Sequence, residues 1–235
     1  MNNIGDNIRQ IQKEIAEAAR RAGRDPAAVK IVAVSKGVPP AGIRQAQAAG
    51  LTAFGENRVQ EFVRKYREIG AEVEWHFVGY LQRNKVKYLC GLVNLIHSLD
   101  RWELAVELNR WALKKKEVFS TLVQVNVARE PLKHGLYEEE VLDFLAAVAG
   151  LPGVRVRGLM TMAPYVYDPE DARPVFRRLR ELALKCRDVP NVSMEFLSMG
   201  MTQDFAVAIE EGANMVRIGR AVFGPRQCQG RESNG

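Results

Sequence analysis

The sequence predicts an α/β fold, a single (β/α)8 barrel of the TIM type with one additional helix at its N-terminus. Short apolar runs of strand length alternate with segments of helical periodicity, the pattern of parallel strands joined by helical crossovers. Eight such runs are present, and the 235 residues of the chain come close to the roughly 250 that an eight-fold barrel uses. A doubly wound open sheet is the rival fold, because a strand count alone does not exclude it.

The strand predictions rest on runs rich in β-branched and other apolar residues, which are typical of strands buried on both faces. They cover residues 31–34, 51–54, 75–78, 95–99, 121–127, 154–162, 194–199 and 215–219.

Helical spacing is clearest in three segments. The additional N-terminal helix is predicted from Ile4, Ile8, Ile11 and Ile15, which follow steps of four, three and four. Later in the chain, one shared face carries Val141, Leu145 and Val148, and another carries Val175, Leu179, Leu182 and Cys186.

The domain prediction is simple because the chain has no Ser/Gly-rich linker and no break in composition. Residues 1–224 are expected to form one domain. The polar stretch 225–235 has nothing to bury, so it is expected to be a flexible C-terminal tail.

Composition narrows the class of protein. An apolar content of 47% and a charged content of 26% are ordinary for a soluble globular domain, and no apolar run approaches the roughly 18 residues of a membrane span. The three cysteines lie far apart and no signal peptide precedes them, which predicts reduced thiols and a cytoplasmic location. A net charge of +6 permits an anionic ligand, but the basic residues are scattered, so nucleic acid is not expected as a partner.

Polar residues follow nearly every predicted strand at its carboxyl end, where barrels of this type carry their functional sites. The first strand, in the segment KIVAVSKGVPP, ends at Ser35 and Lys36. A lysine amine held in a partly desolvated barrel mouth can attack a carbonyl and form a Schiff base.

The loops after strands seven and eight have the composition of a phosphate cradle. They contain the segments Ser198-Met199-Gly200 and Gly219-Arg220, which offer a hydroxyl and backbone N–H groups that glycine leaves open to a close ligand. An aldehyde that carries a phosphate is pyridoxal 5′-phosphate. The sequence therefore predicts this cofactor, bound between the first strand and the last two.

Six segments in series resemble one known family. They are AVSK at 33–36, FGENRVQE at 54–61, WHFVGYLQRNK at 75–85, HSLDR at 97–101, LSMGMTQD at 197–204 and GANMVRIGRAVFG at 212–224. Together they resemble the pyridoxal phosphate homeostasis protein family, the proline synthetase co-transcribed homologues. The resemblance implies a single barrel like the N-terminal domain of alanine racemase, covalently held pyridoxal phosphate, no established turnover, and a role in vitamin B6 and amino-acid homeostasis.

The resemblance also implies roles for six residues. Lys36 corresponds to the Schiff-base lysine, and Asn57 to a polar contact near the cofactor. Ser198, with the backbone N–H groups of Gly219 and Arg220, corresponds to the phosphate site. Arg220 departs from the small hydroxyl residue that many relatives carry, which leaves the contribution of its side chain open.

Arg217 corresponds to the arginine that faces the pyridine nitrogen in alanine-racemase-like barrels. Because a guanidinium does not give up its proton, the ring nitrogen would stay unprotonated and the ring would be a weaker electron sink.

Two functions follow from these assignments. The favoured one is a non-catalytic pyridoxal phosphate-binding protein, a monomer with apo-forms of pyridoxal phosphate enzymes as candidate partners. The alternative is a small amino-acid racemase or decarboxylase. Alanine racemase completes its site with a second domain that brings a tyrosine base, and this chain is expected to end at the barrel, which favours the binding protein.

The three histidines have simpler interpretations. His76 lies within an apolar run and is expected to be a buried structural residue. His97 and His134 show no metal-ligand spacing, so no metal site is expected.

Overall fold

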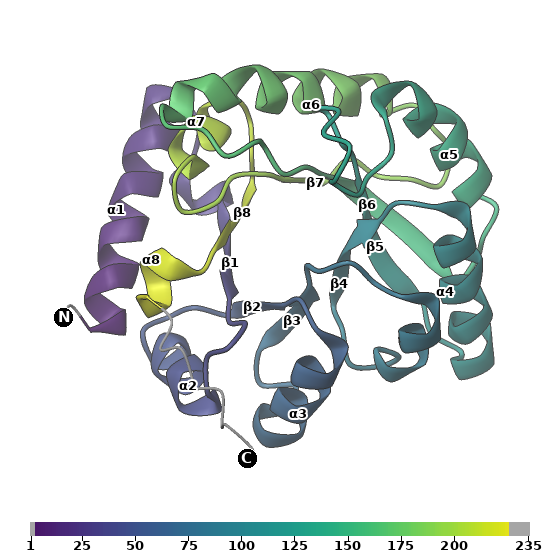
Figure 1. Ribbon diagram of the computed structural model, residues 1–235, viewed down its shortest axis with the longest axis horizontal. Coiled ribbons are helices and arrows are strands. Elements are labelled where there is room, and N and C mark those ends of the chain that lie inside the picture. The colour runs from purple at the N-terminus through teal and green to yellow at the C-terminus, as the bar shows by residue number, and fades with distance from the viewer. Residues whose placement is uncertain (1–2, 226–235) are drawn as a thin grey trace, which may run out of the picture.

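Eight parallel strands close into a barrel in the computed structural model, which describes residues 3–225 (Figure 1). Each strand pairs with the next along the chain, and β1 (Lys30–Val34) pairs with β8 (Met215–Ile218) to close the ring. The others are β2 (Ala53–Glu56), β3 (Glu74–Phe77), β4 (Leu95–Leu99), β5 (Phe119–Gln124), β6 (Val154–Met160) and β7 (Phe196–Ser198). The closed ring confirms the predicted barrel and excludes the doubly wound sheet.

All eight predicted strands are present, but some boundaries differ. β2 extends to Glu56, whereas the apolar pattern placed its end at residue 54. The apolar pattern did not predict this end of β2 because Glu56 is charged, yet it is fully buried and its carboxylate is paired with Lys65. β7 keeps only three of the six residues predicted at 194–199.

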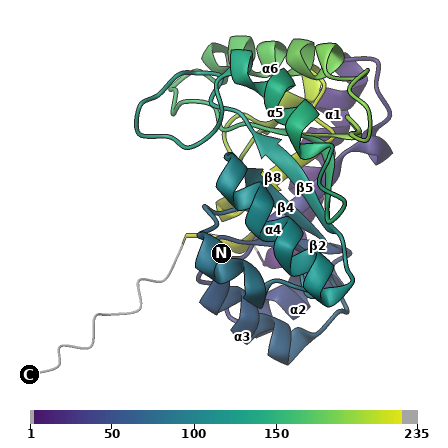
Figure 2. The same ribbon diagram turned by 90° about the vertical axis from the view of Figure 1, so that its right-hand side faces the viewer.

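The helices surround the barrel (Figures 1 and 2). They are α1 (Ile4–Arg21), α2 (Pro40–Ala48), α3 (Val59–Ile69), α4 (Trp102–Lys115), α5 (Val141–Val148), α6 (Arg173–Lys185), α7 (Phe205–Glu210) and α8 (Arg220–Phe223). Short 3-10 helices cover Pro26–Ala28, Arg83–Tyr88, Glu138–Glu140 and Pro169–Ala172. The crossover between β3 and β4 uses the second of these in place of an α-helix. None of the helices within residues 3–225 is long and apolar enough to cross a membrane.

The additional N-terminal helix is confirmed as α1. The Asn3 side chain caps it by accepting a hydrogen bond from the Asp6 N–H at 2.8 Å. Its predicted apolar stripe is buried at Ile8, Ile11 and Ile15, and α1 lies beside α7 and α8 (Figure 1). The apolar faces predicted for α5 and α6 are also buried. The predicted tail begins at residue 225, and residues 226–235 lie outside the part of the chain that the structure describes.

Side chains alternate along each strand between the layer under the helices and the barrel interior. On β8, Val216 and Ile218 join the outer core, while Met215 belongs to a smaller inner cluster. Arg217 shares the inner side of β8 with Met215, so its side chain enters the barrel. The same alternation places His76 on the inner side of β3, between Trp75 and Phe77 of the outer core.

Candidate functional site

The carboxyl ends of β1 and β8 bring the two most separated predicted segments together. Ala33 and Ile218 are paired in the sheet, so Lys36 and the segment 217–220 follow neighbouring strands at the same rim. A Cβ atom at Gly219 would lie 3.2 Å from the Val34 carbonyl oxygen, which shows how closely the two strand ends pack. Lys36 is half-buried in the turn after β1, and Arg220 is exposed at the first position of α8.

Arg217 is fixed inside the barrel by neutral acceptors. Its Nη1 atom donates to the Ser198 hydroxyl oxygen at 2.7 Å, and its Nη2 atom donates to the Thr161 carbonyl oxygen at 2.8 Å. Burial lowers the pKa of Arg217 to about 10, partly offset by the charge of Asp204. The guanidinium therefore stays charged at neutral pH and serves only as a hydrogen-bond donor and a positive charge.

Ser198 is fully buried, and its hydroxyl lies inside the barrel. Besides accepting from Arg217, it is hydrogen-bonded to the Nδ1 atom of His97 at 3.0 Å. When the Ser198 hydroxyl donates to the Nδ1 atom of His97, its proton is not available to a phosphate. The phosphate role predicted for this side chain therefore competes with bonds that the structure already contains.

The turn that carries Lys36 is held on both sides. The Ser35 hydroxyl donates to Glu56 Oε1 at 2.6 Å, and the Gly37 N–H donates to Glu61 Oε1 at 2.6 Å. Lys65, on α3, donates to the same two carboxylate oxygens at 2.6 and 2.7 Å and to the Ser35 carbonyl oxygen at 2.6 Å. We call Ser35, Glu56, Glu61 and Lys65 the turn clamp.

The electrostatics of the turn clamp are those of a buried ion pair. Lys65 and Glu56 are both fully buried. Burial raises the pKa of Glu56, against the opposing effect of the Lys65 ammonium. Burial also acts to raise the pKa of Glu61, but hydrogen bonds from Lys65 and the Gly37 N–H bring it below its usual value. The second oxygen of Glu56, Oε2, is buried without a hydrogen-bond partner in the structure.

Asn57 follows β2 directly and packs against the end of β3. A Cβ atom at Gly79 would lie 2.7 Å from the Asn57 Cα atom and would also overlap its carbonyl group, so only glycine fits there. Asn57 is half-buried and stands one residue after Glu56 of the turn clamp.

His76 is buried, as the sequence predicts, and the three histidines have contacts that the sequence did not predict. His76 and His97 are fully buried, and His76 Nδ1 lies 2.8 Å from His97 Nε2. His134 stacks on Tyr80 at a ring distance of 4.1 Å. Within residues 3–225, no group of three histidine, cysteine or carboxylate side chains is arranged to hold a metal ion.

The turn clamp was missed by the sequence interpretation, although a signal for it exists. Lys65 falls on the apolar stripe of α3 formed by Phe62 and Ile69, and Glu61 stands one helical turn before it. A lysine in a buried stripe requires acceptors, since an unpaired buried ammonium is costly. No comparable local pattern in the sequence indicates the contacts of Ser198 with His97 and Arg217.

Comparison with known proteins identifies the family. The sequence-family model of the alanine racemase N-terminal domain matches residues 2–227. A pyridoxal phosphate homeostasis protein of Aquifex aeolicus is 47% identical over 96% of this chain and 99% of its own length. One from Escherichia coli K12 is 40% identical over 96% and 98%. The chain belongs to the pyridoxal phosphate homeostasis protein family.

A solved structure supports the same family assignment. PipY of Synechococcus elongatus PCC7942 in its pyridoxal phosphate-bound form has a TM-score of 0.79 and 36% identity, covering 89% of this chain and all of PipY. More distant likeness shows the fold alone: the alanine racemase of Corynebacterium glutamicum has a TM-score of 0.61 at 20% identity. The resemblance of the six sequence segments to the pyridoxal phosphate homeostasis protein family is therefore confirmed.

Proposed function

We propose that this protein binds pyridoxal 5′-phosphate covalently through Lys36 in the barrel mouth and serves the cell's vitamin B6 and amino-acid homeostasis. The observation that carries the proposal is the pairing of β1 with β8, which brings the turn after β1 and the start of α8 to the same rim of the barrel. The cofactor-bound state of PipY, a relative 36% identical, supports it.

The residues at this rim match the chemistry of the cofactor. Lys36 offers a primary amine for the aldehyde. Gly219 and Arg220 offer N–H groups at the first turn of α8, where a helix has no internal acceptors for them. A Cβ atom at Gly219 would lie 3.2 Å from the Val34 carbonyl oxygen, and the missing side chain lets a ligand approach this backbone closely. Arg217 offers a fixed positive charge that can face the pyridine nitrogen.

When bound, the cofactor supplies an electrophilic carbon and a conjugated ring that withdraws electrons. The protein would supply the rest. The turn clamp would orient the Lys36 turn, Asn57 would contact the cofactor from the end of β2, and the α8 N–H groups would receive the phosphate. Arg217 would donate a hydrogen bond to the ring nitrogen and withhold a proton from it.

We propose further that the protein is not an enzyme. The relatives from Aquifex aeolicus and Escherichia coli carry names for homeostasis and not for a reaction. A monomeric state, a cytoplasmic location, a single domain over residues 1–224 and exchange of the cofactor with apo-enzymes complete this proposal.

The covalent site can be located by reduction. Borohydride treatment of protein loaded with pyridoxal 5′-phosphate should fix one cofactor per chain, and peptide mass spectrometry should place it on Lys36. An adduct mainly on Lys85 or Lys133 would show that the site assignment is wrong. Free pyridoxal without the phosphate serves as the matched ligand control, and it should load less completely.

Turnover is expected to be negligible. Racemisation needs acid–base groups on both faces of the substrate carbon, and the two histidines inside the barrel are fully buried and hydrogen-bonded to each other. Loaded protein should therefore leave L- and D-amino acids unchanged, as followed by chiral chromatography and CO2 release. Median enzyme turnover is on the order of 10 per second. A rate near this value that is lost in Lys36→Ala would restore the racemase or decarboxylase hypothesis.

A further inference from the structure

A line of hydrogen bonds crosses the barrel interior from one end to the other. It connects side chains of β1, β3, β4, β7 and β8, in the order Lys30, Glu74, His76, His97, Ser198 and Arg217. The successive distances are 2.7, 2.9, 2.8, 3.0 and 2.7 Å, all of hydrogen-bond length. We call these six residues the barrel chain.

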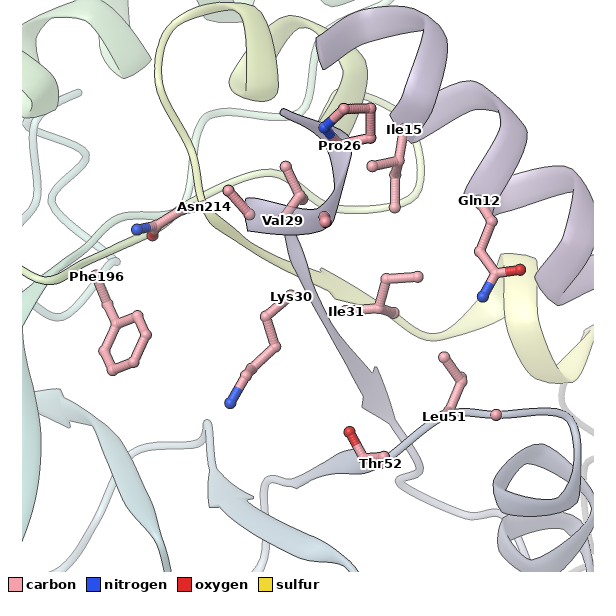
Figure 3. Close-up of a pocket in the computed structure, with 13 residues that line it drawn as sticks. Gln12, Ile15, Pro26, Val29, Lys30, Ile31, Leu51, Thr52, Phe196 and Asn214 are labelled. Atoms are coloured by element: carbon pink, nitrogen blue, oxygen red, sulfur yellow. The ribbon is translucent and has the colours of Figure 1, made fainter. Parts of the chain in front are cut away.

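The lower end of the barrel chain is open to water. Lys30 and Glu74 begin β1 and β3, and their side chains are 35% and 32% exposed. Lys30 lines a pocket of about 550 Å³ at the amino ends of the strands, together with Phe196 and Asn214 (Figure 3). The other end is closed to water, because Arg217 is only 5% exposed and His97 and Ser198 before it are fully buried.

The donor and the acceptor of each hydrogen bond in the barrel chain can be assigned by starting at Glu74. Hydrogen bonds from His76 and Lys30 lower the pKa of Glu74 to about 2, despite its partial burial, so this carboxylate only accepts. His76 must therefore carry its proton on Nε2. Burial lowers the pKa of His76 and, further still, that of His97, so both rings are neutral at pH 7.

Neutrality then fixes the remaining protons. A neutral His76 has Nδ1 free to accept, so His97 donates from Nε2, and its own Nδ1 must accept from the Ser198 hydroxyl. The Ser198 oxygen in turn accepts from Arg217, which can only donate. Starting from Glu74 or from Arg217 gives the same directions. Along the barrel chain from Arg217 to Glu74, each residue donates its hydrogen bond to the next residue on the Glu74 side.

We propose that His97, backed by His76 and Glu74, is a positioning residue that holds the Ser198 hydroxyl in the one orientation that accepts from Arg217. The guanidinium is thereby fixed where the proposed cofactor's ring nitrogen would meet it, and in this respect the inference rests on the proposed function. His97 is fully buried, and in this proposal it acts only through Ser198.

Protonation of His76 at low pH should reverse the direction of the hydrogen bonds among His76, His97 and Ser198. A proton added to His76 makes both of its nitrogens donors, so His97 must accept at Nε2 and move its own proton to Nδ1. Ser198 then accepts from both His97 and Arg217 and keeps its hydroxyl proton, which no longer has an acceptor within the barrel chain. One proton enters and none is lost. The charged groups that face the two rings are Glu74, Lys30, Arg157 and Arg217.

The proton positions can be measured without the cofactor. In ¹⁵N-labelled apoprotein at pH 7, long-range ¹H–¹⁵N spectra should show His76 and His97 as neutral rings protonated at Nε2. A charged ring, or an Nδ1-protonated ring at either position, would overturn the proposal. Because this arm uses the wild-type protein, it remains decisive even if a His97 variant fails to fold.

Three variants of His97 separate positioning from packing. The Asn Oδ1 atom can occupy the place of Nδ1 and still accept from Ser198, whereas the Gln amide reaches only the place of Nε2. Leu keeps neither contact. We expect His97→Leu and His97→Gln to bind pyridoxal 5′-phosphate about tenfold more weakly, the effect of one hydrogen bond to a charged group, and His97→Asn to stay within about threefold of wild type.

The matched control is His134→Asn, which should leave affinity unchanged. Hydrogen exchange of the Arg217 guanidinium in apoprotein should accelerate in the Leu and Gln variants alone. Equal affinity and equal exchange in all three His97 variants would overturn the proposal. Wild-type protein that takes up no cofactor would overturn the proposed function instead, and the tautomers and the exchange rates would still decide the role of His97.

Discussion

Replacing Lys36 with arginine should abolish covalent uptake of pyridoxal 5′-phosphate and leave the barrel folded. Arginine keeps the positive charge, but its guanidinium cannot serve as the amine nucleophile that an aldehyde requires. The side chain is half-buried in a turn at the rim, outside both clusters of the apolar core. The free energy of unfolding should therefore change by about 1 kcal/mol or less.

Two measurements check this result together. Borohydride treatment followed by intact mass should show no fixed cofactor in Lys36→Arg, and denaturant unfolding should keep the wild-type midpoint. Lys133→Arg is the matched control, because Lys133 is also a partly exposed lysine, paired with Glu130 at 2.8 Å. A fixed adduct that survives in Lys36→Arg and disappears in Lys133→Arg would move the site to the other lysine.

The barrel could be predicted from the sequence because its determinants are local. Each strand is a short apolar run, each long helix has an apolar stripe, and the alternation of the two permits few topologies. Lys36 could be selected for a similar reason, since a charged residue directly after the run 31–34 stands at a strand end in any parallel barrel.

The contacts around the site could not be predicted because they depend on register between distant strands. Ser198 and His97 are 101 residues apart and meet only once the barrel closes. The hydroxyl of Ser198 suggested a phosphate contact, but the sequence could not show that Arg217 and His97 are already hydrogen-bonded to it. His76 was correctly expected to be buried, and its link to Glu74 emerged only from the structure.

Lys65→Met should destabilise the protein by about 3–5 kcal/mol, the cost of leaving a buried charge without its partner. The ammonium of Lys65 satisfies three acceptors, and two of them belong to carboxylates. Methionine fills similar space but leaves the fully buried Glu56 carboxylate with only the Ser35 hydroxyl. Arg67→Met, on the exposed side of the same helix, is the control and should change stability by about 0.5 kcal/mol or less.

The pH dependence of Lys65→Met should reveal the mechanism. Burial already raises the pKa of Glu56 against the effect of Lys65, so without Lys65 the pKa rises further. Between the unfolded pKa near 4.5 and this higher folded value, the folded variant binds more protons than the unfolded chain. Its stability should therefore increase relative to wild type as the pH falls from 7 toward 5. A gap that stays constant across this range would attribute the loss to packing.

A second substitution tests whether cofactor affinity is lost because the Glu56 charge is unpaired or because the turn clamp no longer holds the Lys36 turn. In Lys65→Met with Glu56→Gln, no buried charge is left unpaired at position 56, so more than half of the lost stability should return. The Ser35 carbonyl and Glu61 still lack their lysine, so the Lys36 turn remains loosely held. Affinity for pyridoxal 5′-phosphate should stay at least tenfold below wild type although the fold has recovered, a loss of about 1.4 kcal/mol. Recovery of both stability and affinity would make the turn clamp a structural ion pair with no part in positioning Lys36.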